Sequence, residues 1–487
     1  MTDIRYVCLS DMHLGEEDSL LTNLQTAKSI IDPLSPSPVM TGLVKCLEHL
    51  LGENKDGDKP TLILNGDILE LALTTTNNAA MVFEQFIQLI MAPGKEFFKE
   101  IIYVPGNHDH HQWEIARESQ YANHIQTIKA GTELPVPYHA TSMFVEDKAR
   151  PPAYFLNTLI QRYKHLKDFK ITIAYPNYGL LRDDDKKCVI FHHGHYIESL
   201  YHLMTNLQGM IFPDQKPPQQ VWNIEAENFA WIDFFWSSMG RSGKVGQDVE
   251  LIYEKMQDKE EFKKLLYNLA NSLAKKYDLP GWGDAMEAQF LKWGFSFLVD
   301  KFMGTERGHV DQVLSQDAEK GLRAYMNGPL VAQNNLEREI KKKQESEIDL
   351  GKDVTADVTF VFGHTHKPYS MDMNLRKYTN WVNVYNTGGW VVESVDPQPL
   401  HGGAMVLIDD KLNAASVRLY NEQSDPGNYT VRVEEAMRAG EKPNLLHKSL
   451  KKIIDPAKDP WKSFSAAVAR SVHVREQHLR ARINEKD

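Results

Sequence analysis

The residues of this sequence that are best suited to chemistry lie in five short motifs rich in histidine and aspartate. Imidazole nitrogens together with carboxylate and amide oxygens suit Mn, Fe or Zn, whereas an all-oxygen set would suit Mg or Ca. The motifs are spread over about 350 residues, so only folding can bring them together. In chain order they are Asp11-Met12-His13, Gly66-Asp67, Gly106-Asn107-His108-Asp109, His192-His193-Gly194-His195 and Gly363-His364-Thr365-His366.

The motifs contain more ligand side chains than one metal ion can use. Seven side chains are too many for a single ion and suit two ions that share a carboxylate, about 3.5–4 Å apart, across a phosphoryl group. A lone motif of this kind is a weak signal, but five in order predict a dinuclear centre. We expect Mn, with Fe, Zn or Mg as the alternatives. The candidate ligands are Asp11, His13, Asp67, Asn107, His193, His364 and His366.

Each motif directly follows a short apolar run that is rich in β-branched residues. Such a run, bounded by turn residues, is typical of a strand buried on both faces. Ligands at the ends of different strands converge in space although they are distant in sequence. The runs therefore predict one composite site, and they span residues 6–9, 62–64, 101–104, 189–191 and 358–362.

Residues 1–195 alternate between predicted strands and helices. Met40–Leu51 and Ala79–Met91 both have apolar residues at helical spacing, and each leads into a strand run. This alternation predicts a layered α/β fold with helices on the outside. Residues 354–422 add strand signals at 382–385, 404–408 and 415–420, which would complete a second sheet.

Between the fourth and fifth motifs, residues 196–353 have a different character and predict an inserted helical cap. Val249–Lys276 and Asp284–Met303 show apolar residues at helical spacing. The segment Asn228–Met239 is dense in large aromatic side chains. That segment is either packing inside the cap or an apolar groove for a substrate or another subunit.

Composition and charge limit the class of protein. A chain of 487 residues requires one core with large insertions or two domains. A net charge of −11 disfavours a surface that coats nucleic acid. Residues 423–487 are predicted to form a basic helical extension, with 13 Lys/Arg against 8 Asp/Glu from Val431 onward. The extension is either a solvated tail or a patch for an anionic partner such as phospholipid or nucleic acid, which would permit peripheral membrane contact.

Three cysteines, Cys8, Cys46 and Cys188, form no pairing pattern and indicate a reducing compartment. The sequence contains no run of 18 or more apolar residues, and strand-like sequence begins at Ile4 in place of a signal peptide. We therefore expect a cytoplasmic protein.

Together the motifs resemble those of the calcineurin-like metallophosphoesterase superfamily. That family has Asp-x-His, Gly-Asp, Gly-Asn-His-Asp/Glu, a His near Gly, and Gly-His-x-His, and this sequence matches every element. Asn386-Thr387-Gly388 also resembles the family's Asn-x-Gly turn. The resemblance covers about 1–195 and 354–422. It implies a four-layer αββα sandwich and in-line attack by a metal-bridging hydroxide on phosphorus.

The resemblance also implies a role for each ligand. Asp67 would bridge the two metals. The first metal would be held by Asp11, His13 and His366, and the second by Asn107, His193 and His364.

The resemblance also implies a catalytic pair. His108 would face the phosphate as a general acid or transition-state stabiliser, oriented by Asp109.

The fourth motif offers three histidines for one ligand position. His193 is preferred as the ligand over His192 and His195 because it directly precedes the glycine, and because strand alternation turns His192 to the opposite face.

Two branches of the superfamily share the opening Ser10–Leu14 type of motif. Gly66–Glu70 and His193-Gly194 resemble elements of UDP-2,3-diacylglucosamine pyrophosphate hydrolases, which also use a helical cap. This sequence departs from them in having His108 where they typically carry Arg, and in its longer insertion. The other branch comprises double-strand-break repair nucleases. We favour a phosphodiester or pyrophosphate substrate with an apolar, lipid- or nucleotide-linked portion. The alternatives are a Mn-dependent nuclease and a non-catalytic metal-binding scaffold.

Overall fold

The computed structural model describes most of the chain outside the insertion. The described residues are 2–25, 30–144, 150–182, 187–238, 306, 311–335, 357–438 and 440–486. The helices predicted at 249–276 and 284–303 lie outside these residues, as does Met239. The predicted division into a core of 1–195 and 354–422, a cap of 196–353 and an extension of 423–487 therefore stays a prediction.

A seven-stranded sheet carries the first three motifs. Its order is β14-β13-β12-β1-β4-β5-β6, in which β1, β4, β5 and β6 are parallel and β12 is antiparallel to β1. Parallel neighbours bring the carboxyl ends of β1, β4 and β5 to one edge of the sheet. The strands are β1 (Ile4–Leu9), β4 (Thr61–Leu64), β5 (Glu100–Tyr103), β6 (Ile171–Ile173), β12 (Gly402–Asp409), β13 (Ala414–Asn421) and β14 (Arg432–Glu434).

A five-stranded sheet carries the last two motifs. Its order is β10-β11-β9-β8-β7, with β8, β9 and β11 parallel and the two edge strands antiparallel to their neighbours. The strands are β7 (Asn177–Arg182), β8 (Lys187–His192), β9 (Asp357–Phe362), β10 (Tyr369–Met373) and β11 (Val382–Asn386). A separate short pair joins β2 (Leu24–Gln25) to β3 (Ile30–Ile31).

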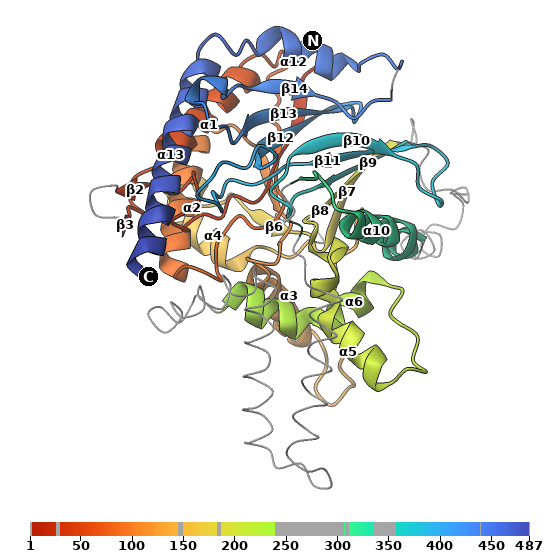
Figure 1. Cartoon of the computed structure of the whole chain (residues 1–487). Helices are drawn as coiled ribbons and strands as arrows, with labels where there is room; N and C mark the ends of the chain where they lie inside the picture. Colours follow the sequence, from red (N-terminus) through yellow and green to blue (C-terminus); the bar gives the residue numbers. More distant parts are fainter. Residues whose placement is uncertain are drawn as a thin grey trace.

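The two sheets pack face to face and are covered by helices on both outer sides, which gives four layers (Figure 1). Cys8 and Val361 belong to the apolar layer between the sheets. The outer face of the seven-stranded sheet packs against α1 (Pro38–Leu51), α2 (Thr76–Ile90), α4 (Tyr154–Ile160), α12 (Leu445–Ile453) and α13 (Trp461–Lys486). The five-stranded sheet packs against α6 (Val221–Trp231) and α10 (Gln316–Tyr325).

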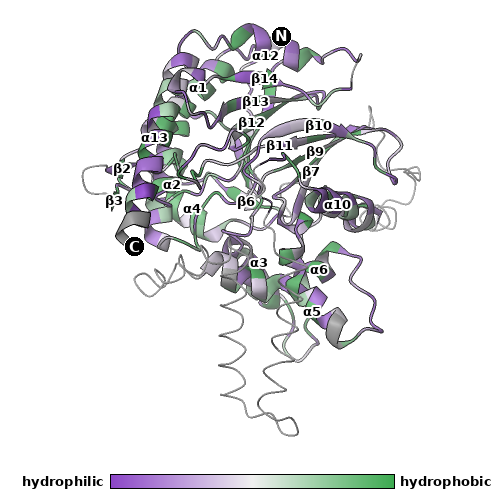
Figure 2. Cartoon of the chain, viewed as in Figure 1, coloured by the Kyte–Doolittle hydropathy of each residue, from purple (hydrophilic) through white to green (hydrophobic). Residues whose placement is uncertain are grey.

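Alternation of side chains along β1 explains the layering. Val7 belongs to the core under the outer helices, whereas its neighbour Cys8 belongs to the core between the sheets. A strand buried on both faces needs a continuous apolar sequence, which is the signal that predicted it. Figure 2 shows the complementary pattern on the outside, where hydrophilic residues colour much of α12 and α13.

The structure confirms the five predicted motif strands, the helices at Met40–Leu51 and Ala79–Met91, and the later strands at 382–385, 404–408 and 415–420.

The three cysteines are buried and free. Within the described parts of the chain, none of the helices combines the length and apolar character needed to cross a bilayer. The helix α3 (His111–Ile125) follows the third motif, and α5 (Leu203–Ile211) lies within the predicted insertion.

The last helix is fastened to the loop that follows the first motif. Arg475 of α13 is 3% exposed and donates hydrogen bonds to the backbone oxygens of Ser19, at 2.9 Å, and Thr22, at 2.6 Å. Further along, Arg482 pairs with Asp18 at 2.6 Å. Two of the basic residues of the C-terminal extension, Arg475 and Arg482, therefore contact groups of the same chain.

We predict that Arg475→Ala destabilises the fold. The substitution removes the side-chain donor to the Thr22 and Ser19 carbonyls, of which Ser19 keeps the Thr22 amide, and an unsatisfied buried group costs roughly 1–3 kcal/mol. Urea unfolding followed by circular dichroism should show a free energy of unfolding lower by about that amount. Arg480→Ala, at an exposed position of the same helix, is the control. Equal stability of the two variants would contradict the anchoring role.

Candidate metal centre

The five motifs meet at the carboxyl ends of β1, β4, β5, β8 and β9. The backbone turns sharply there, and five of the seven candidate ligands have positive φ angles, a conformation that residues other than glycine rarely adopt. Strain of this kind persists only where the surrounding structure enforces it, and it is concentrated at functional sites. The angles are 49° at Asp11, 43° at His13, 51° at Asp67, 69° at His364 and 57° at His366.

Asp11, His13 and His366 form one buried cluster. His13 Nε2 lies 3.2 Å from His366 Nε2, which lies 3.5 Å from Asp11 Oδ1. Nitrogen and oxygen atoms that converge in this way could hold one metal ion. These are the three residues that the resemblance implies for the first metal.

A second buried cluster contains Asp67, Asn107, His193 and His364. His193 Nε2 lies 3.1 Å from both Asp67 Oδ2 and Asn107 Oδ1, and His364 joins Asp67 and His193 in a group able to hold an ion. Asp67 Oδ2 is also 3.9 Å from His13 Nε2 of the first cluster. Asp67 therefore stands between the two clusters, where a bridging carboxylate belongs.

The second nitrogen of each candidate histidine ligand faces an oxygen atom. Histidines that bind metals almost always direct their other nitrogen at a carboxylate, carbonyl or water, which fixes the ring. The donor set therefore fits a pair of divalent ions. The pairs are His13 Nδ1 with Glu70 Oε2 at 2.8 Å, His366 Nδ1 with Glu393 Oε1 at 2.9 Å, His364 Nε2 with Glu198 Oε1 at 3.1 Å, and His193 Nδ1 with the Asn65 carbonyl at 3.2 Å.

Sequence reasoning did not identify the three carboxylates in this outer ring. The sequence does contain a signal that could have identified Glu70, because this residue ends the Gly66–Glu70 segment that follows β4. Glu198 and Glu393 lie five and 27 residues beyond His193 and His366, and no spacing rule singles them out. Only the folded geometry places them against the imidazoles.

The charges in the site favour cations. Burial alone would raise the pKa of Asp67, but His193 and His108 hold it well below its usual range. Burial alone would lower the pKa of His193, but the Asp67 carboxylate raises it to about 9. The raised pKa favours the protonated imidazole at neutral pH, so a metal ion at this position would compete with a proton.

The motif glycines allow the ligands to approach closely. A Cβ atom on Gly363 would lie 2.0 Å from Asp11 Oδ2, and one on Gly106 would lie 2.3 Å from Asp67 Oδ1. Gly66, with φ +85°, would clash with the His193 ring in the same way. Larger residues at these positions would displace the ligands themselves.

His108 lies at the edge of both clusters and contacts Glu70. Its Nδ1 is 2.8 Å from Glu70 Oε2, and its backbone N–H donates to Asp67 Oδ1 at 2.7 Å. The expectation that Asp109 orients this ring needs correction. The Asp109 carboxylate accepts hydrogen bonds from the Gly106 and Ile68 backbone amides and from Tyr103, so it shapes the loop, and Glu70 faces the imidazole.

The fourth motif places one of its three histidines among the candidate ligands. The His192 ring packs against Tyr325, with ring centroids 4.6 Å apart, and the His195 ring lies 4.3 Å from that of Tyr196. Burial holds the pKa of His192 and of His195 well below the usual range, so both rings are neutral. The geometry thus agrees with the preference for His193.

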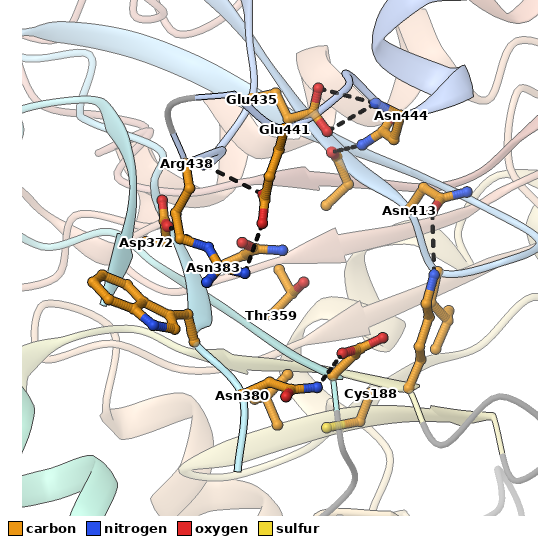
Figure 3. A pocket seen from close by; sticks show the side chains of 16 residues that line it. Cys188, Thr359, Asp372, Asn380, Asn383, Asn413, Glu435, Arg438, Glu441 and Asn444 are labelled. Carbon is orange, nitrogen blue, oxygen red and sulfur yellow. Dashed lines mark hydrogen bonds and ion pairs between the residues drawn. The ribbon is translucent and has the colours of Figure 1, made fainter. Parts of the chain in front are cut away.

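A second hollow, of about 320 Å³, lies at the opposite end of the sheets, where Lys187 and Asp357 begin β8 and β9. Figure 3 shows Arg438 extending into it, 2.6 Å from Glu441 and 3.6 Å from Asp372. None of the motif residues lines this hollow, so it is separate from the metal clusters.

Comparison with known proteins agrees with the site. Residues 4–235 match the family model described as calcineurin-like phosphoesterase. No curated protein matches the chain. One similar solved structure is a dimetal phosphatase from Danio rerio, with 8% sequence identity, covering 90% of this chain and 100% of that chain at a TM-score of 0.28. A likeness this weak carries no argument.

We predict that the protein binds two Mn ions per chain. Each cluster provides its own ligands, and Asp67 lies between them. Metal analysis after Mn loading and gel filtration should therefore give about two equivalents of Mn per chain. Asp67→Ala should reduce this to one or fewer, while Asp58→Ala, on the exposed loop before β4, should leave it unchanged. A single tightly held ion in the wild type would contradict the shared carboxylate.

We predict that His108→Ala removes proton transfer without removing metal. General acid–base catalysis contributes about 10²–10⁴-fold, so kcat on bis-4-nitrophenyl phosphate should fall by that factor. Mn content should stay near wild type, as it should in the control His124→Ala, an exposed position on α3. Loss of metal from the His108 variant would show that His108 is a ligand.

Proposed function

Because this chain belongs to the calcineurin-like phosphoesterase family, we propose that its metal centre hydrolyses a phosphodiester or pyrophosphate bond. The family match makes the chain a metal-dependent phosphoric ester hydrolase. The observation that carries the proposal is the pair of buried clusters with Asp67 between them, 3.1 Å from His193 and 3.9 Å from His13. Two divalent ions held there would neutralise phosphoryl oxygens and lower the pKa of water.

The residues of the chain divide the remaining work. Asp11, His13 and His366 would hold the first ion, and Asn107, His193 and His364 the second. His108 directs Nδ1 toward Glu70, so Nε2 is the nitrogen that would donate a proton to the leaving oxygen. Burial of the whole cluster strengthens each electrostatic contact by excluding water.

A large cavity supports a substrate with an apolar portion. Its volume is about 780 Å³, and Glu198, whose carboxylate lies 3.1 Å from His364, is part of its wall. Apolar and aromatic side chains, among them Ile197, Ile224 and Tyr325, also line it. A phosphoester bound at the metals could place its non-phosphate group here.

The charged residues of the same cavity disfavour a nucleic-acid strand. Among the described residues that line it, Glu198, Glu306 and Asp317 are acidic, and Lys320 is the one cation. A strand of phosphates needs Lys and Arg along its path. We therefore place an amphiphilic phosphoester ahead of DNA or RNA.

The deciding assay compares Mn-dependent hydrolysis of single-stranded DNA with that of a nucleotide-linked glycolipid, at matched concentration. We expect turnover of the glycolipid, because the cavity beside His364 takes an apolar group, and little cleavage of DNA. Asp11→Asn should be inactive on both and serves as the background. Efficient DNA cleavage without glycolipid turnover would reverse the ranking and make the protein a nuclease.

A further inference from the structure

A second set of buried polar residues includes two that directly follow the third and fourth motifs, His110 and Tyr196. At its centre is Glu225 of α6, which is 0% exposed. Its Oε1 lies 2.7 Å from His110 Nε2, and its Oε2 accepts hydrogen bonds from Tyr175, at 2.9 Å, and from Tyr196. A carboxylate removed from water needs several such partners, and here all three come from other segments of the chain.

Two of the three partners of Glu225 belong to the loops that carry the second metal's candidate ligands. His110 follows Asn107 by three residues, at the point where α3 begins. Tyr196 follows His193 by three residues, in the turn after β8. One carboxylate therefore joins the loop after β5 to the loop after β8. Across the same two loops, Asn107 Oδ1 lies 3.1 Å from His193 Nε2.

The junction has further support on both sides. Tyr175, which precedes β7, stacks on Trp113 of α3 with ring centroids 5.2 Å apart. Asp233, eight residues beyond Glu225, brings Oδ1 to 3.4 Å from His110 Nδ1. His110 is thus held between two carboxylates, one on each ring nitrogen. Both come from the segment between the fourth and fifth motifs.

We propose that Glu225 is a positioning residue for the second metal site. It fixes the distance between the two loops, so that the Asn107 oxygen and the His193 nitrogen converge on one ion. The proposal rests on the proposed function and deepens it, because it gives α6 a direct part in assembling the metal centre. Groups that hydrogen-bond the ligands themselves typically contribute 10–100-fold to metal affinity, and this range sets the scale for Glu225, which acts on the ligands through the two loops.

The test uses Glu225→Gln, which keeps the side-chain shape, Glu225→Ala, and the control Glu227→Gln on the same helix, whose partner is Thr205. Calorimetric Mn titration gives the Kd of each site, and Asp11→Ala and Asn107→Ala assign the two binding phases. We expect the Kd of the second site to rise about tenfold in Glu225→Gln and up to 100-fold in Glu225→Ala. The first site should change by less than about twofold.

Activity is measured separately on bis-4-nitrophenyl phosphate, where kcat at fixed Mn should fall and KM should stay unchanged. Equal weakening of both sites would reduce Glu225 to a general stabilising role and overturn the proposal, as would an unchanged second site. If Glu225→Ala does not fold, the isosteric Gln variant decides. A wild type that binds two ions but hydrolyses no phosphoester would refute the proposed function, while the Mn titrations would still test Glu225.

Discussion

The arrangement of this protein depends on one buried carboxylate, that of Asp67. It has no access to water, so imidazoles, a backbone amide and, when bound, metal ions must compensate its charge. His193 lies 3.1 Å away and the His108 amide donates at 2.7 Å. Several features bring positive or polarisable groups to Asp67. They are the sharp turns, the glycines without room for a Cβ atom, and the left-handed backbone conformation of the candidate ligands.

The sequence predicted the strands because they depend on local rules, and the same rules place the candidate ligands at the strand ends. Strands buried on both faces require unbroken apolar runs, and turns packed against Asp67 or Asp11 require glycine at Gly106 and Gly363. Alternation along β8 also separated His192 from His193. The edge strand β10 escaped prediction because Ser370 and Asp372 interrupt its apolar character, as expected where one side of a strand is unpaired.

The roles that depend on tertiary contacts could not be predicted. Asp109 follows His108 directly, yet its carboxylate caps backbone amides, and the carboxylate facing the imidazole is Glu70. In the aromatic segment, Ile232 and Trp236 are buried in the core beneath the five-stranded sheet, whereas Phe234 is 68% exposed. Its described part is therefore mostly packing, and the large cavity is lined by other residues.

The contact between Arg475 and the loop at Ser19 and Thr22 joins residues more than 450 positions apart. During synthesis, a chain that has emerged as far as residue 440 already contains every candidate ligand, but not the helix that fastens the loop after Asp11 and His13. The candidate ligands would therefore be synthesised before α13, the helix whose Arg475 holds the loop after the first motif. The loop after the first motif therefore gains this fastening only in a chain that already contains α13.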